Sequence, residues 1–229
     1  MTRVERQAAL ETIAAEVRTC TRCRLANGRT NAVPGEGSPD TEVVLVGEGP
    51  GFHEDRTGRP FVGRAGGVLQ ELLESIEWRR TDVFITNVVK CRPPDNRDPE
   101  PDEIAACAPY LERQLQTLDP ALIVTLGRFS LGTFVPGTRI SQVHGTVHRV
   151  DPARGARDAS VLALYHPAAA DRSADVKRQS FDDVARAPHA LLDARARRAS
   201  RAVDAAPASH PAAQPPAAAP NPAADITIF

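Results

Sequence analysis

The stretch EVVLVGEGPG, residues 42–51, decides the fold class of this chain. It opens on a short run of apolar, largely β-branched residues and passes directly into a loop that contains three glycines. A continuous apolar run that ends in turn residues is typical of a strand buried on both faces, because a half-exposed strand would alternate polar and apolar side chains. Such strands are typical of parallel sheets, and we therefore expect a sheet that helices cover on both sides.

The rest of the chain repeats this pattern of buried strands and helices. Further strands are expected at residues 82–89 (DVFITNVV), 121–126 (ALIVTL) and 160–165 (SVLALY). Helices are expected at residues 5–19, 66–78, 99–118 and about 174–193. Strands that alternate with helices predict an α/β fold with three layers, α/β/α, around a central, mainly parallel four-stranded sheet.

The composition predicts one domain and a tail. Of 229 residues, 41% are hydrophobic, which suffices for one medium-sized core. From about residue 195 the chain becomes rich in Ala and Pro, and such a segment buries too little apolar surface to offset the entropy of ordering. We expect a folded domain over residues 1–194 and a disordered tail over residues 195–229.

Charge and hydropathy exclude two classes of protein. The formal net charge of −1 excludes DNA binding through a global positive field, although a local basic face remains open. No apolar run reaches the length of a membrane span, and the N-terminal segment has the pattern of an amphipathic helix, not of a signal peptide. We expect a cytoplasmic monomer that does not bind membranes.

Four cysteines are the clearest candidates for a metal site. Cys20 and Cys23 are spaced as a chelating pair, Cys91 follows a predicted strand, and Cys107 lies in a predicted helix. Disulfides are not expected in a reducing compartment, and by spacing alone the four thiolates suit zinc and a [4Fe–4S] cluster equally well. Four buried free thiols are the remaining alternative.

Three loops that follow predicted strands carry nearly all of the unusual residues. They span residues 47–63, 87–97 and 166–172. In parallel sheets the loops beyond the carboxyl ends of the strands lie at one edge, where ligands bind. The first loop, GEGPG, matches neither a Rossmann fingerprint nor a P-loop, and taken alone it is equally consistent with a tight turn. The three loops together predict an active site.

Four segments of the chain resemble one enzyme family. They are CTRCRLANGRTNAVPGEG (20–37), GEGPGFHEDRTGRPFVGRAG (47–66), TNVVKCRPPDNRDP (86–99) and YHPAAADR (165–172). In this order they resemble the family 4 uracil-DNA glycosylases, the iron–sulfur members of the uracil-DNA glycosylase superfamily, over about residues 10–193. The resemblance implies the three-layer fold and a [4Fe–4S] cluster on the four cysteines. It also implies base-excision repair, in which uracil is removed from single- or double-stranded DNA by hydrolysis of the N-glycosidic bond.

The resemblance implies roles for residues of the three loops. Phe61 is expected to stack on a uracil flipped out of the DNA, and Asn87 to recognise its edge, because an amide accepts from N3–H and donates to O4. His166 is the candidate that hydrogen-bonds O2 and stabilises the departing uracil anion. Outside this context the alternatives are a core aromatic, a loop-capping Asn and a structural His.

The carboxylate that activates water is not in its usual place. Other branches of the superfamily carry an Asp at the position of Gly49. Glu48 and Glu54 are therefore the candidates, and Glu54 has the alternative role of closing the pocket against the methyl group of thymine. We assign Glu48 to catalysis, and Gly49 and Glu54 to substrate binding.

Contacts to the DNA backbone are expected from six arginines of the three loops, namely Arg56, Arg59, Arg64, Arg92, Arg97 and Arg172. The superfamily places a wedge that fills the vacated base stack near residues 170–171. This chain has Ala170 and Asp171 there, which argues against an efficient wedge. A related branch that cross-links to DNA carries a His in the second loop; residues 92–98 contain none, so covalent trapping is not expected.

Two other functions remain open on the sequence. One is a catalytically weak DNA-damage-binding module that keeps the cluster; the other is an electron carrier, which would not need three converging loops. The tail ends in Asp225, Ile226, Thr227, Ile228 and Phe229, which resemble the short peptides by which bacterial repair enzymes bind the sliding clamp. A C-terminus without function is the alternative.

Overall fold

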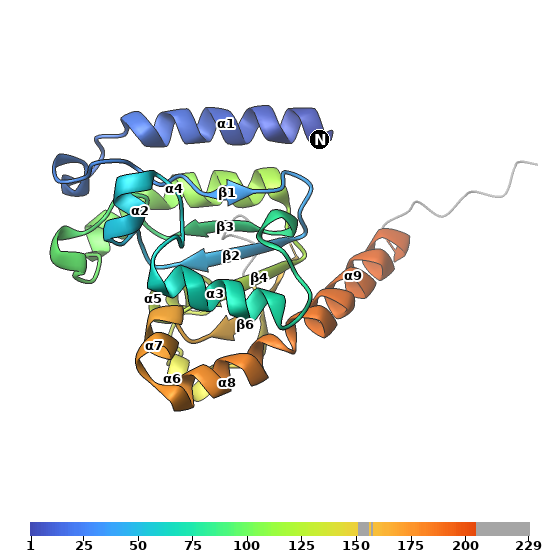
Figure 1. Cartoon of the computed structure of the whole chain (residues 1–229). Coiled ribbons are helices and arrows are strands. Elements are labelled where there is room, and N and C mark those ends of the chain that lie inside the picture. Colours follow the sequence, from blue (N-terminus) through green and yellow to red (C-terminus); the bar gives the residue numbers. More distant parts are fainter. Residues whose placement is uncertain (151–155, 157, 205–229) are drawn as a thin grey trace, which may run out of the picture.

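The strands form one sheet. In the computed structural model, which describes residues 1–150, 156 and 158–204, the sheet has six strands in the order β1-β3-β2-β4-β6-β5 (Figure 1). Their bounds are Glu36–Gly37 (β1), Val43–Gly47 (β2), Phe84–Asn87 (β3), Leu122–Leu126 (β4), Val147–Arg149 (β5) and Ser160–Leu164 (β6). The four central strands are parallel, whereas β1 and β5 pair antiparallel at the two edges.

The four strands expected from the sequence are the four parallel strands, so the predicted fold class is confirmed. The sheet itself has two more strands than expected. The sequence does not indicate β1 and β5, because they contain two and three residues and no apolar run. In β1, a Cβ at Gly37 would lie 2.0 Å from the carbonyl oxygen of Val83, so only glycine allows this close pairing.

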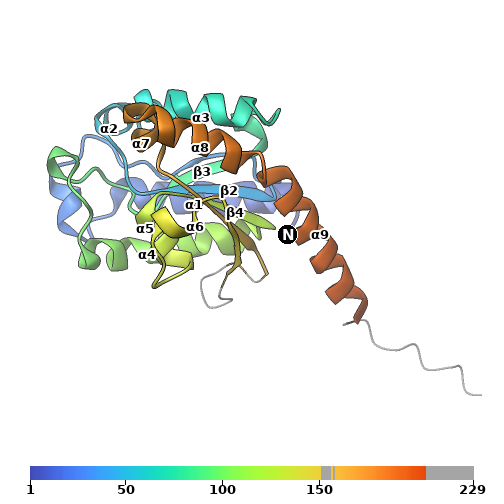
Figure 2. The same cartoon turned by 90° about the horizontal axis from the view of Figure 1, so that it is seen from below.

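Helices cover both faces of the sheet (Figure 2). One face carries α1 (Arg3–Thr19), α4 (Pro101–Leu118) and α5 (Arg128–Phe134). The other carries α3 (Arg64–Glu74), α7 (Pro167–Arg172), α8 (Ala174–Val184) and α9 (Ala187–Asp204). The short helices α2 (Phe52–Thr57) and α6 (Ile140–Val143) lie in connections between these elements.

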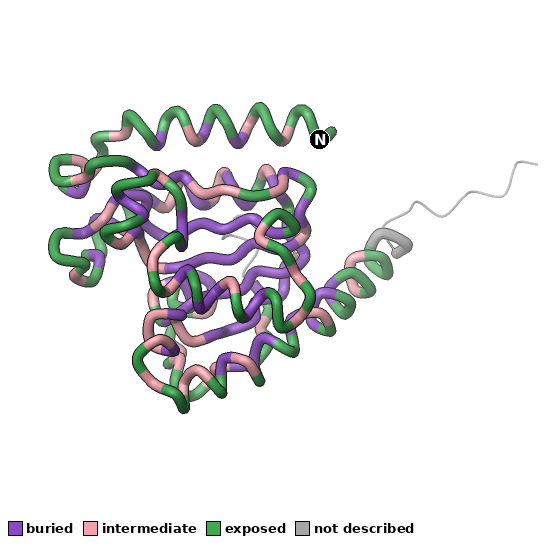
Figure 3. The backbone as a smooth tube through the Cα atoms, in the orientation of Figure 1, coloured by how far each residue is buried: buried purple, intermediate pink, exposed green. Residues whose placement is uncertain are grey.

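Each central strand is buried on both of its faces (Figure 3). Alternate residues belong to different cores: Val44 and Ile123 pack with α1 and α4, whereas Leu45 and Val124 pack with α3 and α9. The absence of polar alternation in the four apolar runs follows directly from this arrangement. Burying one such aliphatic side chain stabilises the fold by about 1.5–3 kcal/mol, and the two cores together hold the loops at the carboxyl edge in place.

The C-terminal part of the domain corrects two expectations. The single helix expected at about 174–193 is two helices, because the chain turns between α8 and α9. Helix α9 continues to Asp204, so the folded part extends ten residues beyond the expected boundary at 194. Arg195 pairs with Glu42, and Arg198 donates to the carbonyl oxygen of Asp119 at 2.9 Å. The C-terminal peptide 225–229 lies outside the described residues.

The composition of residues 195–204 does not by itself indicate this extension of the fold. Alanine is the best helix former, and the arginines spaced through residues 195–201 provide side chains that reach the base of the sheet. None of the described helices combines the length and hydrophobicity that a bilayer crossing would require.

Candidate active site

A cleft of about 770 Å³ lies at the carboxyl ends of the parallel strands. It is lined by residues of all three loops that the sequence singles out, so their convergence is confirmed. The loop after β4 contributes Gly127 and Arg128, which sequence inspection did not select. At Gly127, with φ +95, a Cβ would lie 2.9 Å from Cβ of His166. This glycine therefore allows the loop after β4 to approach the loop that carries His166.

Gly47, Phe61 and Asn87 are packed against one another beside the cleft. A Cβ at Gly47 would lie 2.4 Å from Oδ1 of Asn87 and 2.6 Å from Cζ of Phe61, which explains why the strand β2 ends in glycine. Phe61 is buried, has a backbone φ of +51, and its ring centroid lies 5.9 Å from that of His166. The structure thus brings three predicted substrate contacts, Phe61, Asn87 and His166, to one place.

The position of Phe61 is fixed by a hydrogen-bonded clamp around Glu54. One carboxylate oxygen of Glu54 accepts from the backbone N–H groups of Val62 and Gly63, both at 2.9 Å, and the other accepts from Gly51 at 3.1 Å. Both oxygens of Glu54 are therefore engaged by the loop itself. Glu54 lines the cleft as expected, but this bonding disfavours it as the group that activates water.

Glu54→Gln is expected to lower the free energy of unfolding by about 1.5–3 kcal/mol, because an amide cannot accept all three charge-assisted bonds. The measurement is urea unfolding followed by circular dichroism. Glu74→Gln is the matched control, since Glu74 is an exposed helix residue that accepts only from Gln70. Equal stability of the Glu54 variant and the parent protein would refute the clamp.

Asn87 ends strand β3 with its side chain buried. Its Oδ1 is the only buried side-chain nitrogen or oxygen in residues 1–150, 156 and 158–204 that has no hydrogen-bond partner. Leaving a buried acceptor unsatisfied costs about 1–3 kcal/mol, so such an atom in a cleft indicates that a ligand supplies the missing donor. The expected ligand group is a hydrogen-bond donor.

His166 lies at the start of α7 and its ring is held in one orientation. Its Nδ1 accepts from the backbone N–H of Ala168 at 3.1 Å, which caps the helix. Burial lowers the pKa of His166 to about 4, and the positive charge of Arg172 acts in the same direction. At neutral pH the imidazole is therefore uncharged, and because Nδ1 is an acceptor, Nε2 carries the proton. His166 is thus a neutral hydrogen-bond donor in the cleft.

Glu48 lines the cleft directly after strand β2. Burial raises the pKa of Glu48, and the nearby charge of Asp98 raises it further, while Arg128 opposes both. At Gly49 a Cβ would lie 2.7 Å from Cγ2 of Val89. The space that a side chain would need at residue 49 is therefore filled, and Glu48 is the adjacent residue that can present an acid.

The six arginines predicted to hold DNA fall into two groups. Arg97 forms a bidentate ion pair with the fully buried Glu103, so it braces the second loop, and its role in DNA binding stays a prediction. Arg59 pairs with Glu36 and Arg64 with Asp171 at the surface. Within the described part of the chain, the three that form no ion pair are Arg56, Arg92 and Arg172.

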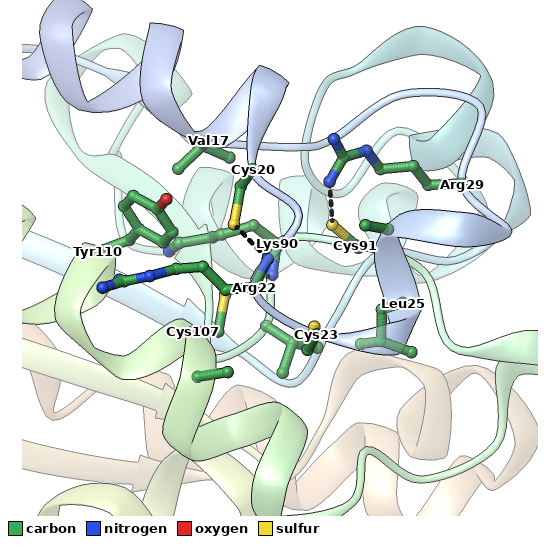
Figure 4. A pocket seen from close by; sticks show the side chains of 13 residues that line it. Val17, Cys20, Arg22, Cys23, Leu25, Arg29, Lys90, Cys91, Cys107 and Tyr110 are labelled. Atoms are coloured by element: carbon green, nitrogen blue, oxygen red, sulfur yellow. Dashed lines mark hydrogen bonds between the residues drawn. The ribbon is translucent and has the colours of Figure 1, made fainter.

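The four cysteines line a second cavity (Figure 4). Cys20 ends α1, Cys23 precedes a 3-10 turn (Arg24–Asn27), Cys91 follows β3 and Cys107 lies in α4. Three sulfurs accept N–H donors, from Arg22 to Cys20, from Arg29 to Cys91 and from Lys90 to Cys107. Converging sulfurs with positive or backbone donors fit a group that carries negative charge.

The donor set of four thiols is one that an iron–sulfur cluster uses, and it is also a ligand set of zinc. Tetrahedral zinc needs all sulfurs within about 2.3 Å of a single point. In the described residues no three Cys, His, Asp or Glu side chains are arranged to hold one ion, although all four thiols face the same cavity. Burial raises the pKa of Cys107 to about 11 and also raises that of Cys91, and a bound cation would favour the thiolate form of both.

Lys90 connects the two sites and sequence inspection missed it. Its side chain is fully buried, and its Nζ donates to Thr86 Oγ1 at 2.6 Å, to the backbone oxygen of Asn87 at 2.7 Å and to Gln114 Oε1 at 2.8 Å. Burial lowers the pKa of Lys90 to about 8. A signal was present, because this Arg-rich chain has only one other lysine, Lys177.

Lys90→Met is expected to lower the free energy of unfolding by about 1–3 kcal/mol, because the substitution keeps the volume and leaves buried acceptors without a donor. Lys177→Met is the control: Lys177 forms a surface ion pair with Glu71, and loss of such a pair costs about 0–1 kcal/mol. The measurement is the free energy of unfolding of both variants in urea. Equal effects of the two substitutions would contradict a supporting role for Lys90.

Known proteins with similar sequences place the chain in a family. The family model of the uracil DNA glycosylase superfamily matches residues 34–187. A type-4 uracil-DNA glycosylase of Archaeoglobus fulgidus is 48% identical over 165 residues, which are 70% of this chain and 82% of that protein. One of Thermotoga maritima is 45% identical over 80% of this chain and 94% of its own length. A type-5 enzyme of Thermus thermophilus is 36% identical over 58% of this chain and 68% of that protein. With these similarities and this cleft, the chain belongs to the uracil DNA glycosylase superfamily and, within it, to the type-4 uracil-DNA glycosylases.

Proposed function

We propose that this protein removes uracil from DNA by hydrolysing the N-glycosidic bond, which leaves an abasic site. The observation that carries the proposal is the buried, unpartnered Oδ1 of Asn87. Uracil offers N3–H to this acceptor and O4 to the amide N–H group of the same side chain. Cytosine presents an acceptor at N3 and a donor at N4, so it would leave both groups mismatched.

The remaining cleft residues suit the chemistry of bond cleavage. A base must leave the stack to enter the cleft, where Phe61 can stack on it. As the bond between C1′ and N1 breaks, the electron pair moves onto uracil, and the Nε2–H of His166 is placed to stabilise the charge at O2. Water adds at C1′, and the proton that it loses balances the one that the uracil anion gains, so the products are an abasic site and neutral uracil. Glu48 is the carboxylate suited to orient that water and to stabilise the cationic sugar.

Phosphate contacts are assigned to Arg56, Arg92 and Arg172, whose guanidinium groups no described carboxylate neutralises. Arg56 and Arg92 lie on the side of the first two loops, and Arg172 follows His166 on the other side. A strand that crosses the cleft would meet a cation on each side of the flipped nucleotide. The cytoplasmic location and the monomeric state stay predictions.

A [4Fe–4S] cluster is assigned to Cys20, Cys23, Cys91 and Cys107. When bound, it supplies a covalent cross-link between α1, the second loop and α4, and takes no part in the hydrolysis. Cys91 lies four residues after Asn87, so this cross-link would brace the recognition loop. Iron and sulfide analysis of anaerobically purified protein, with its visible absorption spectrum, tests the assignment. Stoichiometric zinc without iron would refute it.

The peptide 225–229 is proposed to dock on a sliding clamp. Ile228 and Phe229 could fill an apolar pocket, and the preceding residues would act as a tether. These residues lie outside the described part of the chain, so the proposal rests on the sequence alone. Deletion of 225–229 should abolish binding to purified clamp and leave uracil excision from a short oligonucleotide unchanged. Unchanged clamp binding would end the proposal.

The decisive experiment for the main proposal uses the full chain and two labelled substrates, a uracil-containing single strand and its duplex. After incubation, alkali converts abasic sites to breaks. We expect breaks at uracil and none at cytosine or thymine in the same sequence. No break on either substrate would overturn the proposal and favour a DNA-binding module without activity.

A further inference from the structure

Residues 170 and 171 of the third loop, where a wedge is expected, supply no side chain that could fill the space left by a flipped base. Ala170 is 2% exposed and packs in the core beneath α7, and Asp171 pairs with Arg64 at 3.0 Å. A wedge needs a projecting apolar side chain, and neither residue provides one. If the protein acts on DNA as proposed, another part of the cleft has to hold the bases next to the uracil.

An exposed aromatic side chain belongs to the first loop, next to a residue that lines the cleft. Phe52 is the first residue of α2 and is 48% exposed, although most large apolar residues of the chain are buried. The guanidinium carbon of Arg56 lies 5.8 Å from its ring centroid, and that of Arg92 lies 5.3 Å from it. The first two loops, which are distant in sequence, thus meet at this ring.

This group of three, Phe52, Arg56 and Arg92, borders the cleft. Gly51, which precedes Phe52, and Pro93, which follows Arg92, line the cleft. Asn96 also accepts from Nε of Arg92 at 2.7 Å, which holds the guanidinium beside the ring.

Its chemistry suits the strand of a nucleic acid. Aromatic rings stack on the face of any base, and arginines next to them can bind the phosphates on either side. Within the described residues, neither Arg56 nor Arg92 forms an ion pair, so their charges are available. The arrangement combines the two features by which single-stranded DNA is held without sequence preference.

We propose that Phe52, with Arg56 and Arg92 beside it, stacks on the base adjacent to the uracil and holds the strand while the uracil occupies the cleft. The proposal rests on the uracil-excision function and adds to it a contact on the side of the first two loops. This contact takes the place of the wedge that residues 170 and 171 do not provide. It also makes binding depend on a base that is not itself removed.

The test compares Phe52→Ala and Phe52→Tyr with the parent protein on three single strands. One strand has all its bases, and in the other two the base on the 5′ or the 3′ side of the uracil is replaced by an abasic analogue. On the complete strand, Phe52→Ala should raise KM roughly 5- to 150-fold with kcat nearly unchanged, and Phe52→Tyr should restore KM. On one of the two modified strands, parent and Ala variant should have the same KM.

Leu192→Ala is the matched control, because Leu192 is an exposed apolar residue of α9. It should change KM on none of the strands. The stacking contact would be overturned if the Ala variant had the parental KM on the complete strand. It would also be overturned if KM rose by the same factor on all three strands. Equilibrium binding to a strand with an abasic analogue at the uracil position is measured in parallel. If the parent cleaves no substrate, the excision function fails, while the binding data still decide on Phe52.

Discussion

Asn87→Leu should lower kcat/KM for uracil excision by at least about 100-fold and leave the protein as stable as its parent, or more stable. The loss follows from the chemistry of the site. A cleft that hydrogen-bonds a base no longer distinguishes uracil from other bases when the amide is removed. Removal of one donor to a developing charge already lowers kcat by about 10²–10³. Both hydrogen bonds to uracil are absent in the variant.

The expected gain in stability follows from the same atom. In the free protein Oδ1 of Asn87 is buried without a partner, so the fold bears the cost of a desolvated acceptor. Leucine has a similar shape and no polar atom, and it removes that cost. A residue kept only for structure would behave in the opposite way.

Two measurements on the same preparation check this: single-turnover cleavage of a uracil-containing strand, and urea unfolding. Asn31→Leu is a useful comparison, because the amide of Asn31 donates to the backbone oxygen of Asp55 at 2.9 Å and has a structural partner. That variant should lose stability and keep most of its activity. An Asn87→Leu protein that cleaves within tenfold of the parent would remove Asn87 from the recognition site.

The central fold could be predicted from sequence because burial on both faces leaves a strong signal. Residues 42–46 show no polar alternation, and the three other runs share this property. β1 and β5 leave no such signal, since their place at the edges depends on pairing with β3 and β6. The extension of α9 beyond residue 193 is not indicated by the sequence for another reason: its arginines are anchored on Glu42 and Asp119, which are far away in sequence.

The candidate site was predictable to the level of the loops and only partly to the level of roles. Phe61, Asn87 and His166 meet as expected, since each follows a strand of one parallel sheet. The bonding of Glu54 to three backbone N–H groups, or of Lys90 to the carbonyl of Asn87, depends on how the loops fold back. Residue type alone does not distinguish a carboxylate that clamps a loop from one that acts on water.

His166→Ala should lower kcat for uracil excision by about 10²–10³, since the Nε2–H that stabilises the departing anion is lost. Alanine also removes the acceptor that binds the N–H of Ala168 and caps α7. His166→Asn separates the two effects, because asparagine is a good N-cap and keeps that acceptor. The Asn variant should therefore retain the parental stability and still lose most of the activity. If it kept full activity, the imidazole would not be the group that stabilises the anion.

The pH dependence gives an independent check on the charge of this histidine. An ordinary imidazole, with a pKa near 6.5, would be half protonated at that pH, whereas His166 has a pKa of about 4 in the folded protein. Because the neutral ring both caps α7 and donates from Nε2, the acid limb of kcat/KM that depends on His166 should lie near pH 4. Between pH 6.5 and 4 the unfolded chain binds a proton that the folded protein excludes, so this residue's contribution to stability falls as the pH drops through that interval. In His166→Asn this part of the pH dependence of unfolding should disappear. A parental acid limb at pH 6.5 that the Asn substitution abolishes would show that the folded His166 titrates normally and would refute the neutral-donor role.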